Sequence, residues 1–190
     1  VTVLDDQAPQ ATCPYFPGEN ADRTTDAPAC TYTAVGTEFD ATVSDNCPGV
    51  SGAWSLSGAT TGSGATTLDG TVFNLGVTTV TWTATDAATP TPLTDTCTFT
   101  VTVADDDPPD VTCPSNQNRG TDAPACTYTA VGTEFDPTAS SDNCGSVSVG
   151  WSLSGATTGS GATTLAGTVF SKGVTTVTWT ATDAATPTPL

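Results

Sequence analysis

Histidine and methionine are absent from this chain of 190 residues, and lysine and arginine together number only 3. Without histidine, the chain lacks the commonest general base and one of the commonest metal ligands of enzymes. Aspartate and glutamate number 20, so the formal net charge is −17. A surface of this charge repels phosphate backbones and anionic lipid headgroups. We therefore expect no nucleic-acid partner.

Long apolar runs and helical patterns are missing as well. No stretch has the length of a membrane span, so we expect no membrane insertion, and no segment spaces its apolar residues at the helical period of 3.6. Alternation with a period of 2 is present instead: Val80, Trp82 and Ala84 fall on one face with threonine between them, and residues 97–103 repeat the pattern. Segments rich in glycine and serine, such as residues 57–64, are typical of turns. The sequence predicts an all-β fold.

Three long segments occur twice in the chain. They are TDAPACTYTAVGTEFD at 25–40 and 121–136, WSLSGATTGSGATTL at 54–68 and 151–165, and VTTVTWTATDAATPTPL at 77–93 and 174–190. Near-identical copies suit a spacer, which gains reach with each copy, better than an enzyme, which needs one specialised site. The sequence therefore predicts a tandem array of one structural unit.

The repeats set the expected domain boundaries. Residues 1–6 are interpreted as the end of the last strand of a preceding repeat plus a linker, 7–104 as the first complete repeat, and 105–190 as a second repeat that lacks its last strand. Several short strands with one polar face each predict an immunoglobulin-like β-sandwich in each repeat. The alternation points the tryptophans inward, so we expect Trp54, Trp82, Trp151 and Trp179 to be core residues.

The ordered motifs of both copies resemble the hyalin repeat, or HYR, domain. The resemblance is carried by Pro108-Pro109, VTCP at 111–114, DNC at 142–144, GVTTVTWTATD at 173–183 and, in the first copy, CTFTVTV at 97–103. It implies an extracellular immunoglobulin-like domain associated with adhesion, of the kind found in animal matrix proteins and in large repetitive bacterial surface adhesins. The first copy departs from the pattern, because Ala8-Pro9 replaces the double proline and its segment between Cys13 and Cys30 is longer.

The cysteines are widely and regularly spaced, without the close pairs of zinc sites, which predicts a disulfide framework and an oxidising compartment. They are Cys13, Cys30, Cys47, Cys97, Cys113, Cys126 and Cys144. We expect the pairs Cys13–Cys30 and Cys47–Cys97 in the first copy and Cys113–Cys126 in the second. The partner of Cys144 is expected after Leu190. A pairing between repeats is the alternative, and it would make the array covalently continuous.

Acidic residues gather at the junctions between repeats and at one strand end. We hypothesise that calcium binds there, because hard oxygen ligands from several loops are what this ion needs. The candidate ligands are Asp5, Asp6, Asp86, Asp105, Asp106, Asp107 and Asp183. Asp45 and Asp142, each in a DNC motif, are further acidic residues. The alternative is that these are solvated linker charges, and no EF-hand spacing is present. No cofactor is required.

The sequence favours a structural, non-enzymatic role. We expect a secreted module that forms the stalk or fibre of a cell-surface adhesin or filament, with neighbouring repeats or identical subunits as its partners. Two alternatives stay open: a repeated glycan- or protein-binding module that acts by avidity, and an accessory domain of a larger secreted enzyme. The fibre could be one long chain or subunits joined by donated strands. No Gly-rich phosphate loop is present, since the SGATTGSG segment lacks the lysine of a P-loop.

Overall fold

The structure is a computed structural model that describes residue 1, residues 4–16 and residues 18–184. Within these residues every regular element is a strand, so the predicted all-β class is confirmed. No helix in this part of the chain is long and apolar enough to cross a membrane. The chain divides into two compact units, residues 1–105 and 106–190. Residues 1–6 are predicted to be the end of the last strand of a preceding repeat plus a linker. Residues 2 and 3 of this segment lie outside the described residues.

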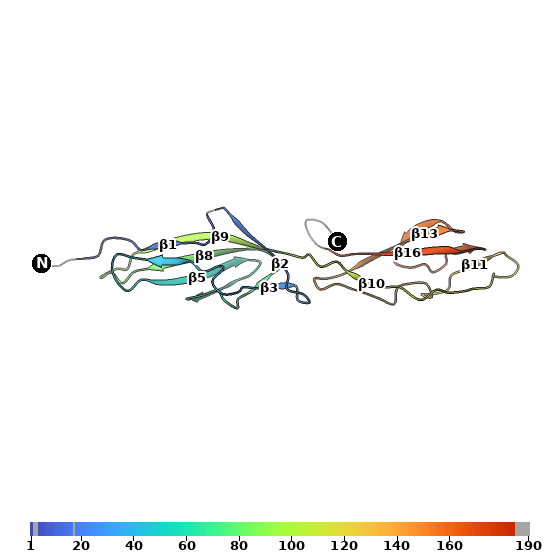
Figure 1. Ribbon diagram of the computed structural model, residues 1–190, viewed down its shortest axis with the longest axis horizontal. Coiled ribbons are helices and arrows are strands. Elements are labelled where there is room, and N and C mark those ends of the chain that lie inside the picture. The colour runs from blue at the N-terminus through green and yellow to red at the C-terminus, as the bar shows by residue number, and fades with distance from the viewer. Residues whose placement is uncertain (2–3, 17, 185–190) are drawn as a thin grey trace. The chain divides into compact units, whose positions relative to one another are not determined.

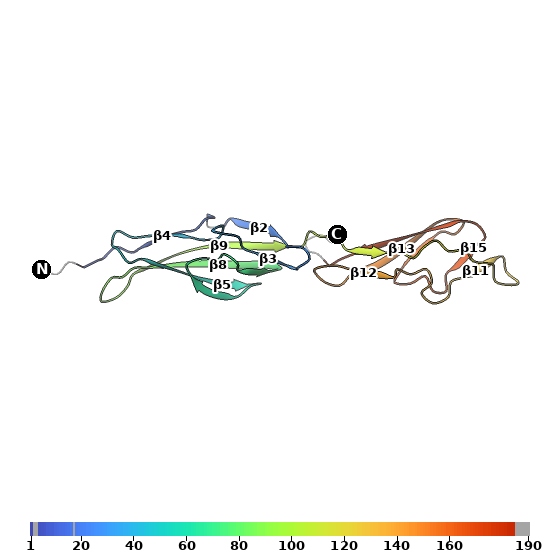
Figure 2. The ribbon, with the colours of Figure 1, turned by 60° about the horizontal axis from the view of Figure 1, so that its bottom comes forward.

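Unit 1 has a main sheet with the strand order β2-β9-β8-β5-β6 and two short strand pairs, β1-β4 and β3-β7. Its strands are β1 (Gln10–Thr12), β2 (Asn20–Thr24), β3 (Thr31–Thr33), β4 (Thr42–Ser44), β5 (Ser51–Gly58), β6 (Gly62–Ala65), β7 (Val72–Asn74), β8 (Gly76–Thr85) and β9 (Thr94–Ala104). Only β2 and β9 pair in parallel. Figures 1 and 2 agree that β9, β8 and β5 run side by side along this unit.

The central strands of unit 1 show the alternation that the sequence predicts. In β8, the side chains of Val80, Trp82 and Ala84 are buried, whereas the threonines between them are partly exposed. In β9, Phe99 to Val103 alternate in the same way. Threonine is β-branched and polar, so it suits the pleated backbone while it faces water. One face of the sheet is therefore apolar and needs a second layer to cover it.

The covering layer is built from β7 and the segment that precedes β4. Phe39 and Phe73 are fully buried, and their rings meet edge to face with centroids 5.3 Å apart. The Trp82 indole packs in the same core and donates a hydrogen bond of 2.9 Å to the carbonyl of Phe39. Burial of each such side chain contributes roughly 2–3 kcal/mol. The core of unit 1 thus lies between the sheet and this second layer.

Unit 2 repeats the same strand pairings with a smaller sheet. Its strands are β10 (Asp110–Thr112), β11 (Thr127–Thr129), β12 (Ala139–Ser141), β13 (Ser148–Gly155), β14 (Gly159–Ala162), β15 (Val169–Ser171) and β16 (Thr175–Thr182). The main sheet has the order β14-β13-β16, and β10-β12 and β11-β15 pair as β1-β4 and β3-β7 do. Trp151 lies opposite Trp179, as Trp54 lies opposite Trp82. All four tryptophans pack in or against a core, as predicted.

The disulfide pairing differs from the prediction. Cys13, which follows β1, is bonded to Cys97 in β9, so the expected Cys13–Cys30 and Cys47–Cys97 pairs are wrong. Sequence spacing favoured the nearest cysteines, but the fold brings the first strand against the last one. Three cysteines are free thiols in the structure: Cys47, Cys113 and Cys126. The expected Cys113–Cys126 bond is therefore wrong as well.

Two further cysteines are oxidised. Cys30 and Cys144 are both disulfide-bonded, so the expectation that Cys144 needs a partner after Leu190 is wrong. Disulfides form and persist in oxidising compartments. The oxidising environment that the cysteine content predicts is consistent with these bonds.

A half-buried ion-pair network holds the segment before β4 in unit 1. Arg23 is 2.7 Å from Glu38, and the same carboxylate accepts hydrogen bonds from the Tyr32 hydroxyl and the Val35 N–H. Burial alone would raise the pKa of Glu38, but the hydrogen bonds from Val35, Tyr32 and Arg23 lower it below its ordinary value. The network fixes Phe39, the next residue, over the sheet.

We predict that removal of the Cys13–Cys97 disulfide, by Cys13→Ser and Cys97→Ser together, lowers the free energy of unfolding of unit 1 by about 4–5 kcal/mol. The bond joins residues 84 positions apart, and a crosslink of that span strongly restricts the unfolded chain. Urea unfolding followed by tryptophan fluorescence measures the change. Cys113→Ser, at an exposed free thiol, is the control and should leave stability unchanged. A peptide map that links Cys13 to Cys30 would contradict the assignment.

Glu38→Gln should destabilise unit 1 by about 2 kcal/mol at neutral pH, because hydrogen bonds to a charged group are lost. The lowered pKa of Glu38 means that its stabilisation is complete above its ordinary value of 4.5 and is lost as the pH falls through the lower folded-state value. The difference between variant and native chain should therefore shrink in acid. Urea titrations at several pH values test this, with Glu19→Gln at an exposed carboxylate as the control. A difference independent of pH would disprove it.

Candidate metal centre

Acidic side chains converge at one end of unit 1, which we call its proximal end. Asp5 precedes β1, Asp45 directly follows β4, and Cys47 lies two residues further on. Their ligand atoms all lie within 4.8 Å of one another. The register explains the meeting, because Ser44 at the end of β4 pairs with the first residue of β1. Two carboxylates and a thiol are thus close enough to share one metal ion.

A third carboxylate of unit 1 reaches this region from the main sheet. Asp86 directly follows β8, and its side chain is only 5 % exposed. One of its oxygens accepts hydrogen bonds from the N–H groups of Ala88 and Leu93, at 3.0 and 2.7 Å. Its charge also contributes to the field at Cys47, together with those of Asp5 and Asp45. The loop after β8 therefore holds the Asp86 carboxylate in place beside the cluster.

The second copy has carboxylates at the corresponding sequence positions. Asp142 directly follows β12, and Asp183 directly follows β16. Asp183 is buried, with 8 % of its surface exposed, and Asp142 is half-buried. In the alignment of the two copies, Asp105, Asp142 and Asp183 correspond to Asp5, Asp45 and Asp86.

The sequence-based hypothesis named some of these residues and missed others. Of the candidate ligands in unit 1, Asp5 belongs to the cluster, whereas Asp86 is not a member and only contributes its charge to the field at Cys47. In unit 2, Asp183 is buried at the end of β16. The clusters found among the described residues do not include Asp6, Asp106 or Asp107. Asp6 and Asp106 are exposed, and Asp107 accepts a hydrogen bond of 3.0 Å from the Asn143 amide.

Asp45 and Asp142 were not among the candidate ligands, although Asp45 is a member of the unit 1 cluster. Both belong to the DNC motif, which occurs once in each copy. The motif was interpreted through its cysteine, and its aspartate lies far in sequence from the acidic linkers between repeats. A signal was present, since the motif ends a short strand whose partner strand begins just after the acidic linker. That pairing becomes visible only with the strand register.

The surroundings of Cys47 do not suit a nucleophile. A hydrogen bond to Asp5, burial and the nearby charges of Asp5, Asp45 and Asp86 all raise the pKa of the Cys47 thiol. A reactive cysteine needs the opposite, because the thiolate is the nucleophilic form and cationic neighbours favour it. The chemistry available at this end of the unit is therefore ligation by oxygen.

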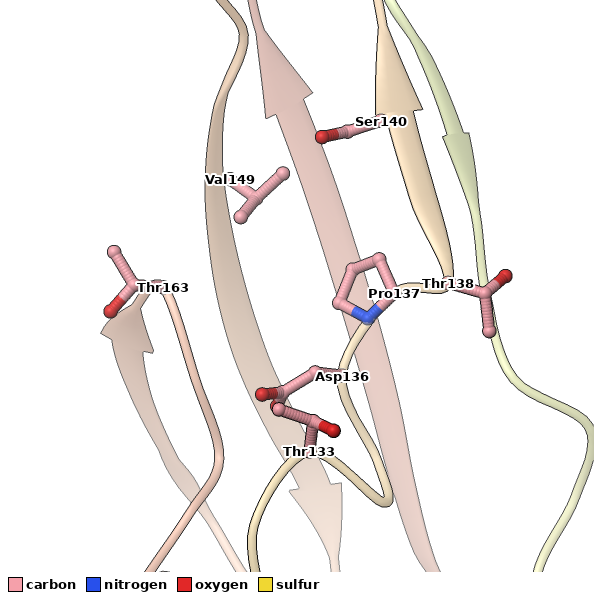
Figure 3. A pocket seen from close by; sticks show the side chains of 7 residues that line it. All are labelled: Thr133, Asp136, Pro137, Thr138, Ser140, Val149 and Thr163. Atoms are coloured by element: carbon pink, nitrogen blue, oxygen red, sulfur yellow. The ribbon is translucent and has the colours of Figure 1, made fainter.

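A hollow on unit 2 is a second candidate site (Figure 3). It is lined by Thr133, Asp136, Pro137, Thr138, Ser140, Val149 and Thr163. In the register of the strand pairs Ser140 takes the place of Val43, which in unit 1 covers Gly52. The Asp136 carboxylate is already used, since it accepts the N–H of Leu165 at 2.8 Å. The hollow is thus a packing difference between the copies and offers no unused charged anchor.

The segment 57–64, expected to form a turn, is largely strand. β5 extends to Gly58 and β6 begins at Gly62, so only residues 59–61 connect them. A Cβ atom on Gly64 would lie 2.5 Å from the Trp54 ring, whose N–H donates to the Thr67 carbonyl. The lack of a side chain at Gly64 leaves room for the Trp54 ring, so this segment has a structural role.

No protein-family model matches the chain, and no curated protein or solved structure is significantly similar to it. The likeness to the hyalin repeat therefore rests on the motifs of the sequence and stays a prediction.

We predict that Gly64→Ala destabilises unit 1 by about 1–3 kcal/mol, because the added methyl group overlaps the Trp54 ring and forces it to move. Urea unfolding gives the stability, and a shift of the tryptophan emission reports the displaced ring. Gly120→Ala is the control, since a Cβ atom there meets nothing within 4 Å and the backbone is not left-handed. Equal stability of the two variants would contradict the proposed role of Gly64.

Proposed function

We propose that this chain is a structural repeat module of an extracellular stalk or fibre, of the hyalin-repeat type, that holds an adhesive or filament tip away from a cell surface. The proposal makes the chain a non-enzymatic part of a secreted, cell-surface protein. Its partners are neighbouring repeats or identical subunits. Each copy adds length to the stalk.

One observation carries the proposal: the side chains that usually anchor ligands are used inside each unit. Tryptophan, tyrosine and arginine dominate binding hot spots. All four indole N–H groups donate to backbone carbonyls of the same unit. Both arginines form ion pairs, Arg23 with Glu38 and Arg119 with Glu134. The tryptophan and arginine side chains of each unit thus stabilise its own fold, as expected of a spacer.

The outer face supports the same role. Val77 apart, the outward-facing positions of β8 and β16 are threonines, which keep the sheet polar without offering charge or aromatic surface. A net charge of −17 keeps such modules soluble and apart from one another. The disulfide between Cys13 and Cys97 compensates for a small core, as in other extracellular modules.

The test is the intact mass of the native protein, measured under denaturing conditions with and without reductant. If the stalk is one long chain of many repeats, we expect a very large species that survives reduction, since peptide bonds alone then hold the array together. The mass of this 190-residue chain, 19.0 kDa, is the reference. Collapse to a species near that mass would mean that separate subunits assemble through donated strands or disulfides.

A second arm separates the spacer from a binding module. Beads coated densely with the 190-residue chain should attach to cells and to glycan-coated surfaces no better than beads coated with albumin. Dense display converts even weak binding into avidity, so a glycan- or protein-binding repeat would show itself. Attachment by the chain alone would overturn the spacer proposal in favour of the binding module.

A further inference from the structure

The cysteines that the two copies share fall into three corresponding positions. In the alignment of the copies, Cys13 corresponds to Cys113, Cys30 to Cys126, and Cys47 to Cys144. At the second and third positions one copy is oxidised and the other is reduced, since Cys30 and Cys144 are disulfide-bonded, whereas Cys126 and Cys47 are free thiols. Both positions are therefore able to form a disulfide, and each of them leaves one thiol unused.

The turn that carries Cys126 has the same local structure as the turn that carries the oxidised Cys30. Both turns belong to the segment that is repeated without change at 25–40 and 121–136. In each copy the aspartate four residues before the cysteine donates its N–H to the carbonyl of the threonine after the cysteine, at 2.7 Å. Cys126 is exposed. It is thus held in a turn that is compatible with a disulfide, and another protein molecule can reach it.

The turn that carries Cys47 likewise matches the turn of its oxidised counterpart. The Cys47 N–H donates to the Asp45 carboxylate at 3.2 Å, and the Cys144 N–H donates to the Asp142 carboxylate at 2.9 Å. Cys47 is half-buried, so part of its surface is accessible to a partner. The second unused thiol is therefore also held in a turn that accepts a disulfide.

The two positions lie at opposite ends within each unit. In unit 1 the Cys47 position follows β4 and the Cys30 position precedes β3, and in unit 2 the same positions follow β12 and precede β11. Figures 1 and 2 show the pair β1-β4 at one end of unit 1 and β3 at the other, and they separate β10 and β12 from β11 in the same way in unit 2. A unit therefore cannot join its own two positions, but it presents one of them at each end.

We propose that copies of this chain are joined head to tail by a disulfide between Cys126 of one copy and Cys47 of the next. The position of Cys13 is served by a cysteine in the last strand, Cys97, which leaves the other two positions to serve each other. The bond joins two different surfaces, so each added copy offers the same pair of ends again. Head-to-tail contacts of this kind that do not close into a ring give an open filament.

The bond needs an oxidant, which we take to be a small disulfide such as oxidised glutathione. The exposed Cys126 thiolate attacks one glutathione sulfur and releases one glutathione thiolate. The Cys47 thiolate then attacks the Cys126 sulfur of this mixed disulfide and releases the second. Two protein thiols thereby lose two protons and two electrons, and one glutathione disulfide becomes two glutathione thiols.

Charge explains why a covalent link is useful to this chain. Each copy has a formal net charge of −17, so two copies repel each other at every orientation that brings acidic surfaces together. A disulfide holds the ends together without an attractive surface around it. This inference goes beyond the stalk proposal and does not rest on it, because a glycan- or protein-binding module could be linked in the same way.

Oxidation of the purified chain with a mixture of reduced and oxidised glutathione tests the proposal. All variants carry Cys113→Ser, so that only Cys47 and Cys126 are free thiols, and the salt concentration is high enough to screen the repulsion. On a denaturing gel without reductant we expect a ladder of multiples of 19.0 kDa that collapses when reductant is added. Addition of Cys47→Ser or of Cys126→Ser should abolish the ladder.

A mixture of these two variants is the decisive sample, because one of them retains only Cys126 and the other only Cys47. We expect a species of two chains and nothing longer, and peptide mapping should find Cys126 linked to Cys47. Serine at either position breaks no disulfide, and circular dichroism checks that each variant is folded. The matched control carries Cys47→Ser and Cys126→Ser but retains Cys113, which is also exposed, and it should stay a single chain.

Three results would overturn the proposal. If the mixture stays monomeric, the two thiols do not serve each other. If either variant forms dimers by itself, like cysteines pair and the link is not head to tail. If the control with Cys113 alone dimerises as fast as the mixture, the reaction reports only the exposure of a thiol.

Discussion

The hydrogen bond from the Trp82 indole to the Phe39 carbonyl joins the two layers of unit 1. It lets a large aromatic ring lie inside the core with its polar N–H satisfied, and it fixes the loop that carries Phe39 over the sheet. The ion pair between Arg23 and Glu38 holds the same loop from outside, with the guanidinium 5.0 Å from the centre of the Phe39 ring. Unit 2 uses the same device, because Trp179 donates to the Phe135 carbonyl.

With so few large apolar residues, these units rely on connections between strands distant in sequence. The main sheet of unit 1 pairs β8 with β9 along its whole length, and the disulfide ties β9 to the segment after β1. Each crosslink restricts the unfolded chain more strongly when it closes a longer loop. The threonine-rich outer faces then need to supply only solubility.

The sequence alone predicts the strands, but it does not predict which strands lie side by side. Alternation placed Val80 and Trp82 inward because burial on one face leaves a period of 2 in the sequence. Phe39 was not singled out, since it lies in a loop where no period marks the inward side. The Cys13–Cys97 bond and the meeting of Asp45 with Asp5 depend on which strands lie side by side. Spacing along the chain carries no such information.

The position of the carboxylates follows from how a strand ends. When β4 and β8 stop, the next residues leave the sheet and need side chains that can bond the freed backbone N–H groups. Aspartate does this well, as Asp45 and Asp86 show. Each carboxylate has two oxygens, however, and the backbone takes only one. The second oxygens of Asp45 and Asp86 are buried without a hydrogen bond, so a requirement of local folding leaves unpaired carboxylate oxygens at the strand ends of unit 1.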